Sequence, residues 1–194
     1  MAVERSRRDA LVMAAFEQIA DRGFEGLRTR EVAAQVGVNI ATLHYYFPTK
    51  EALIRGVVDH AMSRFRSTLT PHGSSPPQLR DHLRAVRKLL RDEPQLGAVM
   101  VELTLRSARD DTIAAILRET YAAWHRTMRG LLRHGAREGG LSPELDSDGV
   151  AALVVATLTA MMLPTITASP QADLALRQLE RWLGLRPAPA VSSN

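Results

Sequence analysis

The residues best suited to chemistry lie together between positions 28 and 50. They carry hydrogen-bond donors, aromatic rings or both: Arg28, Thr29, Arg30, Asn39, Thr42, His44, Tyr45, Tyr46 and Lys50. Side chains of this kind bind phosphate oxygens and read the edges of base pairs in a DNA groove. Two adjacent tyrosines on a short helix also favour a second molecule that covers their rings, since aromatic surface is poorly hydrated.

Two short helices must position these side chains. The pattern predicts one helix over 29–36 and a second over 40–46, with a turn at Gly37 between them. Glycine accepts the positive φ of such a turn, and Ala33 is small enough for the helices to cross closely. The apolar seam of the pair is formed by Val32, Val36, Val38, Leu43 and Phe47. This layout is that of a helix-turn-helix, although an ordinary helical hairpin with a glycine turn has the same spacing.

The rest of the sequence is also typical of helices. Ala, Leu, Arg, Glu and Gln dominate, and no segment alternates apolar and polar residues for long enough to form a strand. We expect an all-α protein with nine helices, over 4–21, 29–36, 40–46, 50–67, 78–91, 94–108, 112–137, 148–167 and 171–183. Pro164 should kink or end the eighth helix, because proline lacks the amide hydrogen used in a helix interior.

The helices divide into two expected domains. Residues 1–48 form the helix-turn-helix unit, and residues 49–186 form a helical bundle whose first helix, 50–67, connects the two. The Pro-, Gly- and Ser-rich segment 70–77 is typical of a loop and marks a boundary. The tail, 187–194, has little apolar surface to bury and is expected to be disordered.

Composition excludes several kinds of site. The chain has no cysteine, which rules out disulfides, thiolate zinc sites and cysteine nucleophiles. Its 25 Lys and Arg residues barely exceed its 21 Asp and Glu residues, so nucleic-acid binding must depend on where individual side chains point. The six histidines form no H-E-x-x-H pair, and neither G-x-S-x-G nor G-x-x-x-x-G-K occurs. We therefore predict no catalytic residue, no metal site and no enzyme activity.

A membrane segment is not expected either. The longest weakly polar run, 150–166, has 17 residues, whereas a spanning helix needs about 20. Arg5, Arg7 and Arg8 precede a short apolar run, as in an export signal, but Glu17 interrupts it. We expect a cytoplasmic protein with no membrane partner, in which the three arginines form a flexible terminus or an arm that contacts DNA.

A set of residues within 11–53 forms a specific pattern: Ala15, Gly23, Phe24, Glu31, Val32, Ala33, Gly37, Val38, Thr42, Leu43, Tyr46, Phe47 and Thr49 to Leu53. This pattern resembles the N-terminal domain of the tetracycline-repressor (TetR) family of transcriptional regulators and covers about a quarter of the chain. The resemblance implies a ligand-responsive repressor that binds a palindromic double-stranded DNA operator as a homodimer. The alternatives are an activator or ligand-blind regulator, and a helical protein-interaction module without operator binding.

The resemblance also implies which residues contact DNA: Arg28, Thr29, Arg30, Asn39, Ile40, Ala41, Thr42, His44, Tyr45, Tyr46 and Lys50. Arg30 is suited to a bidentate contact with guanine, although a solvated surface arginine fits the same position. Thr42 is expected to meet a phosphate. Lys50 is expected to bind another, with help from the dipole of the helix that it begins.

Two positions depart from the family pattern. His44 stands where the family most often has tyrosine. Because the charge of a histidine changes near neutral pH, operator binding is expected to be tighter in mildly acidic solution. Ile40 stands where a polar or basic residue is common. It either touches a thymine methyl group or turns inward against Leu43 and Phe47, and the sequence leaves both open.

The bundle carries less specific signals. The apolar stripe of the helix over 112–137 is typical of a core, but its large residues, with nearby methionines and threonines, also suit an apolar pocket of loose specificity. We predict a small, largely apolar effector and no cofactor. The predicted pocket consists of Met100, Leu103, Thr120, Tyr121, Trp124, Met128, Thr157 and Met161.

The last two predicted helices have more apolar surface than one subunit needs. The helix over 148–167 is apolar nearly all round, whereas a helix on the surface of a monomer keeps one polar face. We therefore predict a homodimer. Its predicted interface consists of Val150, Leu153, Val154, Leu158, Met162, Leu176, Leu179 and Trp182.

Overall fold

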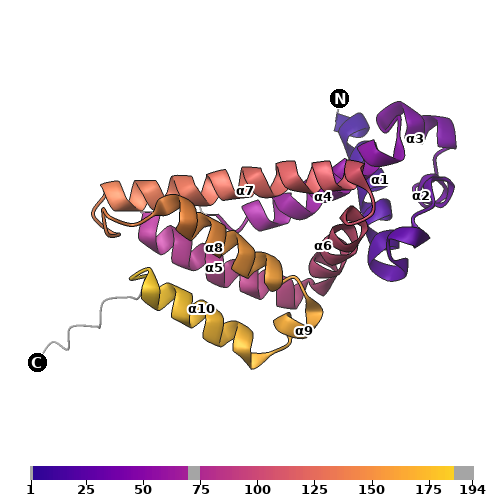
Figure 1. Cartoon of the computed structure of the whole chain (residues 1–194). Coiled ribbons are helices and arrows are strands. Elements are labelled where there is room, and N and C mark those ends of the chain that lie inside the picture. Colours follow the sequence, from indigo (N-terminus) through magenta and orange to yellow (C-terminus); the bar gives the residue numbers. More distant parts are fainter. Residues whose placement is uncertain (1, 70–74, 186–194) are drawn as a thin grey trace, which may run out of the picture.

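All regular secondary structure is helical in the residues that the computed structural model describes, 2–69 and 75–185 (Figure 1). The helices are α1 (Ala2–Arg22), α2 (Thr29–Gln35), α3 (Ile40–Tyr46), α4 (Lys50–Arg66), α5 (Ser75–Asp92), α6 (Pro94–Ser107), α7 (Asp111–Arg137), α8 (Ser147–Ala160), α9 (Pro164–Thr167) and α10 (Pro170–Trp182). A 3-10 helix, η1 (Phe24–Gly26), precedes α2. The all-α class is confirmed, and the described ranges hold one α-helix more than the nine predicted.

Local backbone chemistry explains the two added elements. The predicted helix over 148–167 is divided, because α8 ends at Ala160 and α9 begins at Pro164. Proline is tolerated in a first helical turn, where its missing N–H would be unpaired anyway. The other addition, η1, follows Gly23, whose φ of 69° turns the chain so that Phe24 is buried.

The remaining boundaries differ by a few residues. α5 begins at Ser75, inside the predicted loop over 70–77. The rest of that loop, 70–74, and the predicted disordered tail, 187–194, lie outside the described residues. Helices thus occupy more of the chain than the sequence pattern predicts.

The helix-turn-helix unit of α1–α3 stands at one end of the molecule, and α4 leads from it into the bundle (Figure 1). The longest helix, α7, packs against α4, α5, α6 and α8. α9 and α10 lie along the side of the bundle away from α7. None of the described helices is both long enough and apolar enough to cross a membrane.

One hydrophobic core continues from the N-terminal unit into the bundle. α1 packs against both α4 and α6, and its side chains Leu11 and Ile19 are fully buried. Gly56 marks a close approach in α4, because a Cβ atom there would lie 2.9 Å from Val12 and 3.2 Å from Phe47. The position of α4 and that of the N-terminal unit are therefore linked by direct packing.

Two ion pairs hold α10 against α5. Arg84 donates two hydrogen bonds of 2.7 Å to the carboxylate of Glu180, which is buried. Arg87 donates to Asp173 at 2.9 Å and to the carbonyl oxygen of Thr167 at 2.7 Å. Bidentate arginine–carboxylate contacts fix orientation as well as distance, so the C-terminal helix has a defined place on the bundle.

Candidate nucleic-acid interface

The turn between α2 and α3 has the geometry that the sequence predicts. Gly37 has a φ of 72°, in the left-handed region that favours glycine. The amide of Val38 donates to the carbonyl of Ala33 at 2.9 Å, and the amide of Gly37 donates to that of Ala34 at 3.0 Å. These bonds satisfy carbonyl groups at the end of α2 and fix how α3 leaves the turn.

Asn39 caps the N-terminus of α3. Its Oδ1 accepts a hydrogen bond from the Thr42 amide at 2.8 Å and another from the Thr42 hydroxyl at 2.9 Å. A cap of this kind satisfies amide groups that the first helical turn leaves unpaired. Because Thr42 already gives its hydroxyl proton to Asn39, it can donate to a DNA phosphate only after that bond breaks. Asn39, which is exposed, is therefore the better placed donor of the two.

The outward face of α3 combines small, polar and aromatic groups. Ala41 and His44 are exposed, and Tyr45 is 71% exposed. The half-buried ring of Tyr46 meets that of Tyr45 edge to face, with centroids 5.1 Å apart. Ile40 packs against the hydrophobic core, which is the inward orientation of the two left open by the sequence.

The predicted contacts at the start of α2 divide into two kinds. The Arg28 guanidinium donates to the carbonyl oxygen of Glu25, and the Arg28 amide donates to buried Gln18 at 3.1 Å. Arg28 therefore helps to hold η1 against α1. Thr29 is half-buried, whereas Arg30 is exposed. Of the two arginines, Arg30 is the better placed to reach a base.

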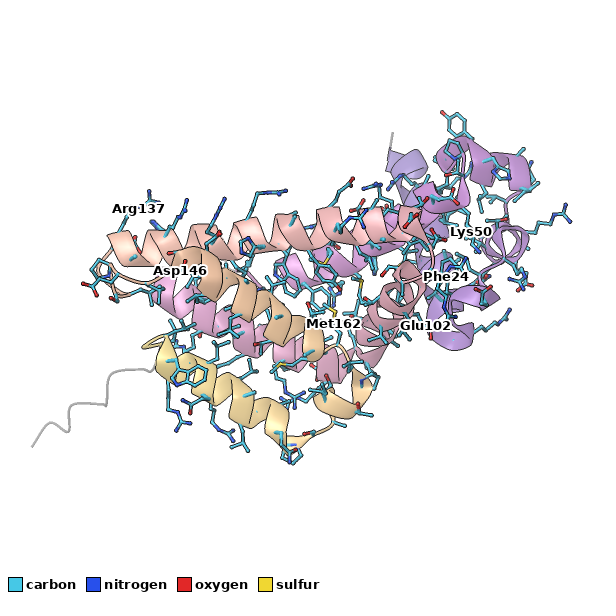
Figure 2. All side chains as sticks on the ribbon, viewed as in Figure 1. Phe24, Lys50, Glu102, Arg137, Asp146 and Met162 are labelled. Atoms are coloured by element: carbon cyan, nitrogen blue, oxygen red, sulfur yellow. The ribbon has the colours of Figure 1, made fainter. Side chains whose placement is uncertain are left out.

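Lys50 lies where α4 leaves the N-terminal unit (Figure 2). Its Nζ is 4.7 Å from the centroid of the Phe24 ring, within the range of a cation–π interaction. The Phe24 amide donates to Glu102 of α6 at 3.2 Å, and the Arg106 guanidinium lies 5.0 Å from the same ring. The lysine predicted to bind phosphate is thus placed at the contact between the N-terminal unit and α6.

The basic residues near the N-terminus belong to a helix. α1 begins at Ala2, so Arg5, Arg7 and Arg8 do not form the flexible terminus considered from the sequence. The Arg8 guanidinium lies 4.9 Å from the ring centroid of Phe47, directly beside the end of α3. Side chains from α1 are therefore held next to the helix-turn-helix.

A cavity of ≈ 300 Å³ lies between α4, α5 and α7. It is lined by Arg55, Asp59, Met62, Phe65, Arg66, Leu69, His82, Glu119, Thr120, Ala123, Trp124 and Thr127. Thr120 and Trp124 belong to the predicted pocket. His82 is completely buried, and burial lowers its pKa to about 4, so its ring is neutral at pH 7. The described residues contain no cluster of three His, Asp or Glu side chains that could hold a metal ion.

The structure places the other predicted pocket residues elsewhere. Four belong to the core, with at most 2% of their surface exposed: Met100, Leu103, Met128 and Met161. Tyr121 lines a shallow apolar groove between α7 and α8, and Thr157 lines neither the groove nor the cavity. Helical spacing shows which side chains are apolar but not which of them other helices cover. Phe65 and His82 lie on helices that carry no separate pocket signal in the sequence.

Some of the residues predicted for a dimer interface are buried within one subunit, and others are exposed. Five are at most 5% exposed within one subunit and so form its own core, leaving no surface for a second copy: Val154, Leu158, Met162, Leu176 and Leu179. Val150 is half-buried, whereas Leu153 is 45% and Trp182 70% exposed. Two further apolar side chains are exposed: Leu174 of α10, and Leu163 between α8 and α9.

Comparison with known protein sequences agrees with this architecture. The family model described as bacterial regulatory proteins, tetR family, matches residues 11–57, and the one described as tetracyclin repressor-like, C-terminal domain, matches residues 69–179. An uncharacterized HTH-type transcriptional regulator of Mycobacterium tuberculosis is 27% identical over 143 residues, which cover 71% of this chain and 67% of the relative. RutR of Escherichia coli is 30% identical over 97 residues, 46% of this chain and 44% of RutR.

Solved structures share the fold over nearly the whole chain. A TetR-family transcriptional regulator from Rhodococcus sp. has a TM-score of 0.77 at 24% identity, covering 92% of this chain and 97% of that one. GusR of Salmonella enterica has a TM-score of 0.74 at 22% identity, covering 92% and 96%. The matched C-terminal model alone spans more than half of the chain. The chain is therefore a helix-turn-helix transcriptional regulator that belongs to the tetR family of bacterial regulatory proteins.

Proposed function

We propose that this regulator is a repressor that binds a two-fold symmetric operator as a homodimer and releases it when a small molecule occupies the bundle. The observation that carries the proposal is Tyr45, 71% exposed on a helix whose opposite face is fixed by buried Leu43 and Phe47. A rigid two-turn helix with an exposed aromatic and polar face suits a major groove. Since the partner would be chromosomal DNA, the place of action would be the cytoplasm.

Exposed apolar side chains at α8 and α10 support a homodimer. Leu153, Leu163, Leu174 and Trp182 are between 40% and 70% exposed. Contact with a second copy would remove this apolar surface from water, which is favourable. In a two-fold dimer the two copies of α3 would enter successive major grooves, about 34–36 Å apart. The operator would then be an inverted repeat.

The ligand response would pass through α4. Arg55 and Asp59 line the cavity, and Gly56, between them in sequence, packs against Phe47 at the end of α3. A ligand that binds one position of α4 better than another shifts the population toward that position. In a dimer, such a shift would change the separation of the two copies of α3. The two copies could then no longer enter their major grooves at the same time.

Selection of double-stranded DNA by the purified protein, at a stated near-physiological salt concentration, tests the proposal. We expect enrichment of an inverted repeat. Tyr45→Ala should lose binding to that repeat while the protein remains folded and dimeric. The matched control is Arg137→Ala, which removes an exposed side chain at the opposite end of α7 (Figure 2) and should leave binding unchanged. A folded dimer that enriches no sequence would overturn the proposal.

A further inference from the structure

The cavity between α4, α5 and α7 contains a buried polar atom that the described residues do not satisfy. His82 is 0% exposed, and its Nε2 has no hydrogen-bond partner among them. Leaving a buried polar atom unpaired costs stability. His82 is one of the residues that line the cavity, but its Nε2 atom has almost no accessible surface, so a molecule bound there can supply the missing partner once a neighbouring side chain moves aside.

The hydrogen bonds around His82 decide which ring nitrogen carries the proton. The Thr68 hydroxyl donates its single proton to the carbonyl oxygen of Phe65 at 2.7 Å. The hydroxyl oxygen of Thr68 also lies 2.6 Å from Nδ1 of His82. Because its proton is already donated to Phe65, this oxygen must act as the acceptor in the contact with His82. Nδ1 therefore carries the proton, and Nε2 presents a lone pair. The lowered pKa of His82 keeps this neutral form at pH 7. The missing partner must be a donor.

The walls of the cavity favour a small aromatic molecule without net charge. Phe65 and Trp124 both line it and stack on each other, with ring centroids 5.8 Å apart and an angle of 11° between planes. The charged residues of the lining balance, two of each sign: Arg55, Arg66, Asp59 and Glu119. The volume of ≈ 300 Å³ is at the lower end of small-molecule sites, which span roughly 300–1,000 Å³, and suits one or two rings.

We propose that the effector is a small neutral aromatic compound whose hydroxyl group donates a hydrogen bond to Nε2 of His82. A carboxylate, or another ligand with acceptors only, would bring a second lone pair against Nε2 and bind poorly. This inference rests on the proposed function, since it names the class of molecule that would occupy the same regulatory site.

Calorimetric titration of the full chain with two probes tests the inference. 2-Naphthol and 2-methylnaphthalene have nearly the same shape and differ by a hydroxyl in place of a methyl group. We expect 2-naphthol to bind about tenfold more tightly, the effect of one buried hydrogen bond. His82→Phe keeps a ring but removes the acceptor, so the two probes should then bind equally. Circular dichroism establishes that the variant is folded.

A second variant tests the position of the proton and does not depend on the first. Thr68→Val removes the acceptor at Nδ1, so the proton can move to Nε2 and the preference for 2-naphthol should fall. The matched control is Thr104→Val. Thr104 also donates to a carbonyl of its own helix, that of Met100, but lies outside the cavity lining. This control should keep the wild-type preference.

Three results would overturn the inference: no binding of either probe, equal binding by the wild type, or a preference that persists in His82→Phe. Operator binding, measured in parallel, separates these failures from failure of the proposed function. A protein that selects an inverted repeat but shows no probe preference is a regulator without this effector class. A protein that prefers 2-naphthol but keeps its operator when the probe is added supports the inference about the cavity and contradicts the ligand response.

Discussion

The ammonium group of Lys50 lies 4.7 Å from the centroid of the Phe24 ring, at the junction of α4 and the N-terminal unit. Arg106 of α6 approaches the same ring to 5.0 Å and also forms an ion pair of 2.8 Å with Glu25. The Phe24 ring thus connects Lys50, which is expected to bind phosphate, with Arg106 of the helical bundle. Any DNA contact made by Lys50 is therefore coupled to the contact between the N-terminal unit and α6.

The first prediction concerns the charge of Lys50. Lys50→Ala should weaken operator binding by a similar factor for all sequences, because a phosphate contact carries no base information. The slope of log affinity against log salt concentration should fall by about one, whereas Lys50→Arg should retain most of it. Titrations at several salt concentrations measure both slopes, with Arg137→Ala as the control for loss of a remote positive charge. An unchanged slope in Lys50→Ala would mean that this side chain does not bind phosphate.

The second prediction concerns stability in acid. Burial lowers the pKa of His82 from 6.5 to about 4. Between about pH 6.5 and 4, the imidazole is therefore protonated in the unfolded chain but neutral in the folded chain. The free energy of unfolding should therefore fall as the pH drops from about 6.5 to 4, by a total of order 3 kcal/mol. His82→Phe lacks this titration.

Urea denaturation at several pH values between 7 and 4 compares the wild type with His82→Phe. Any advantage of the wild type should shrink across this window. The pKa of His60 is also lowered, by burial and by Arg64, but His60 is present in both proteins and its contribution cancels. A difference in unfolding free energy that stays constant from pH 7 to 4 would show that His82 is not neutral in the folded state.

The helix-turn-helix could be predicted from the sequence because the residue patterns that specify it are local. The positive φ of Gly37 and the cap formed by Asn39 depend only on residues a few positions away. The break at Pro164 is local for the same reason. By contrast, η1 is a single turn of helix, too short for any periodic pattern to reveal.

Features that depend on distant helices could not be predicted in the same way. Leu153 and Val154 are adjacent apolar residues, yet one is 45% exposed and the other 0%. A helix that is apolar nearly all round does not show which face its own subunit covers. The cavity likewise requires α4, α5 and α7 to meet, and the proton position on His82 depends on a hydroxyl from beyond the end of α4.

The third prediction compares two glycines within helices. A Cβ atom on Gly97 of α6 would lie 2.5 Å from the carbonyl oxygen of Met162, whereas one on Gly130 of α7 would meet nothing within 4 Å. Gly97→Ala must push apart two backbones and should lower the free energy of unfolding by about 1–3 kcal/mol. Gly130→Ala should raise it by about 0.5–1 kcal/mol, because alanine favours the helix. Urea denaturation of both variants measures the two signs. A stable Gly97→Ala protein would show that α6 is not held this close to Met162.

The fourth prediction concerns the surface of α8. Leu153 is 45% exposed on the face where a second copy is proposed to bind. Leu153→Asp would place an unpaired carboxylate in that apolar contact, which should strongly disfavour the dimer. Because the side chain is exposed in the single subunit, the free energy of unfolding of the monomer should change little. Sedimentation at micromolar concentration should then give a monomer, and affinity for an inverted repeat should fall because one half-site contact is lost. Leu105→Asp is the matched control, since Leu105 is 66% exposed and belongs to α6 rather than to α8 or α10, and this variant should stay dimeric. If both variants sediment as dimers, the two copies meet through a surface other than the one around Leu153.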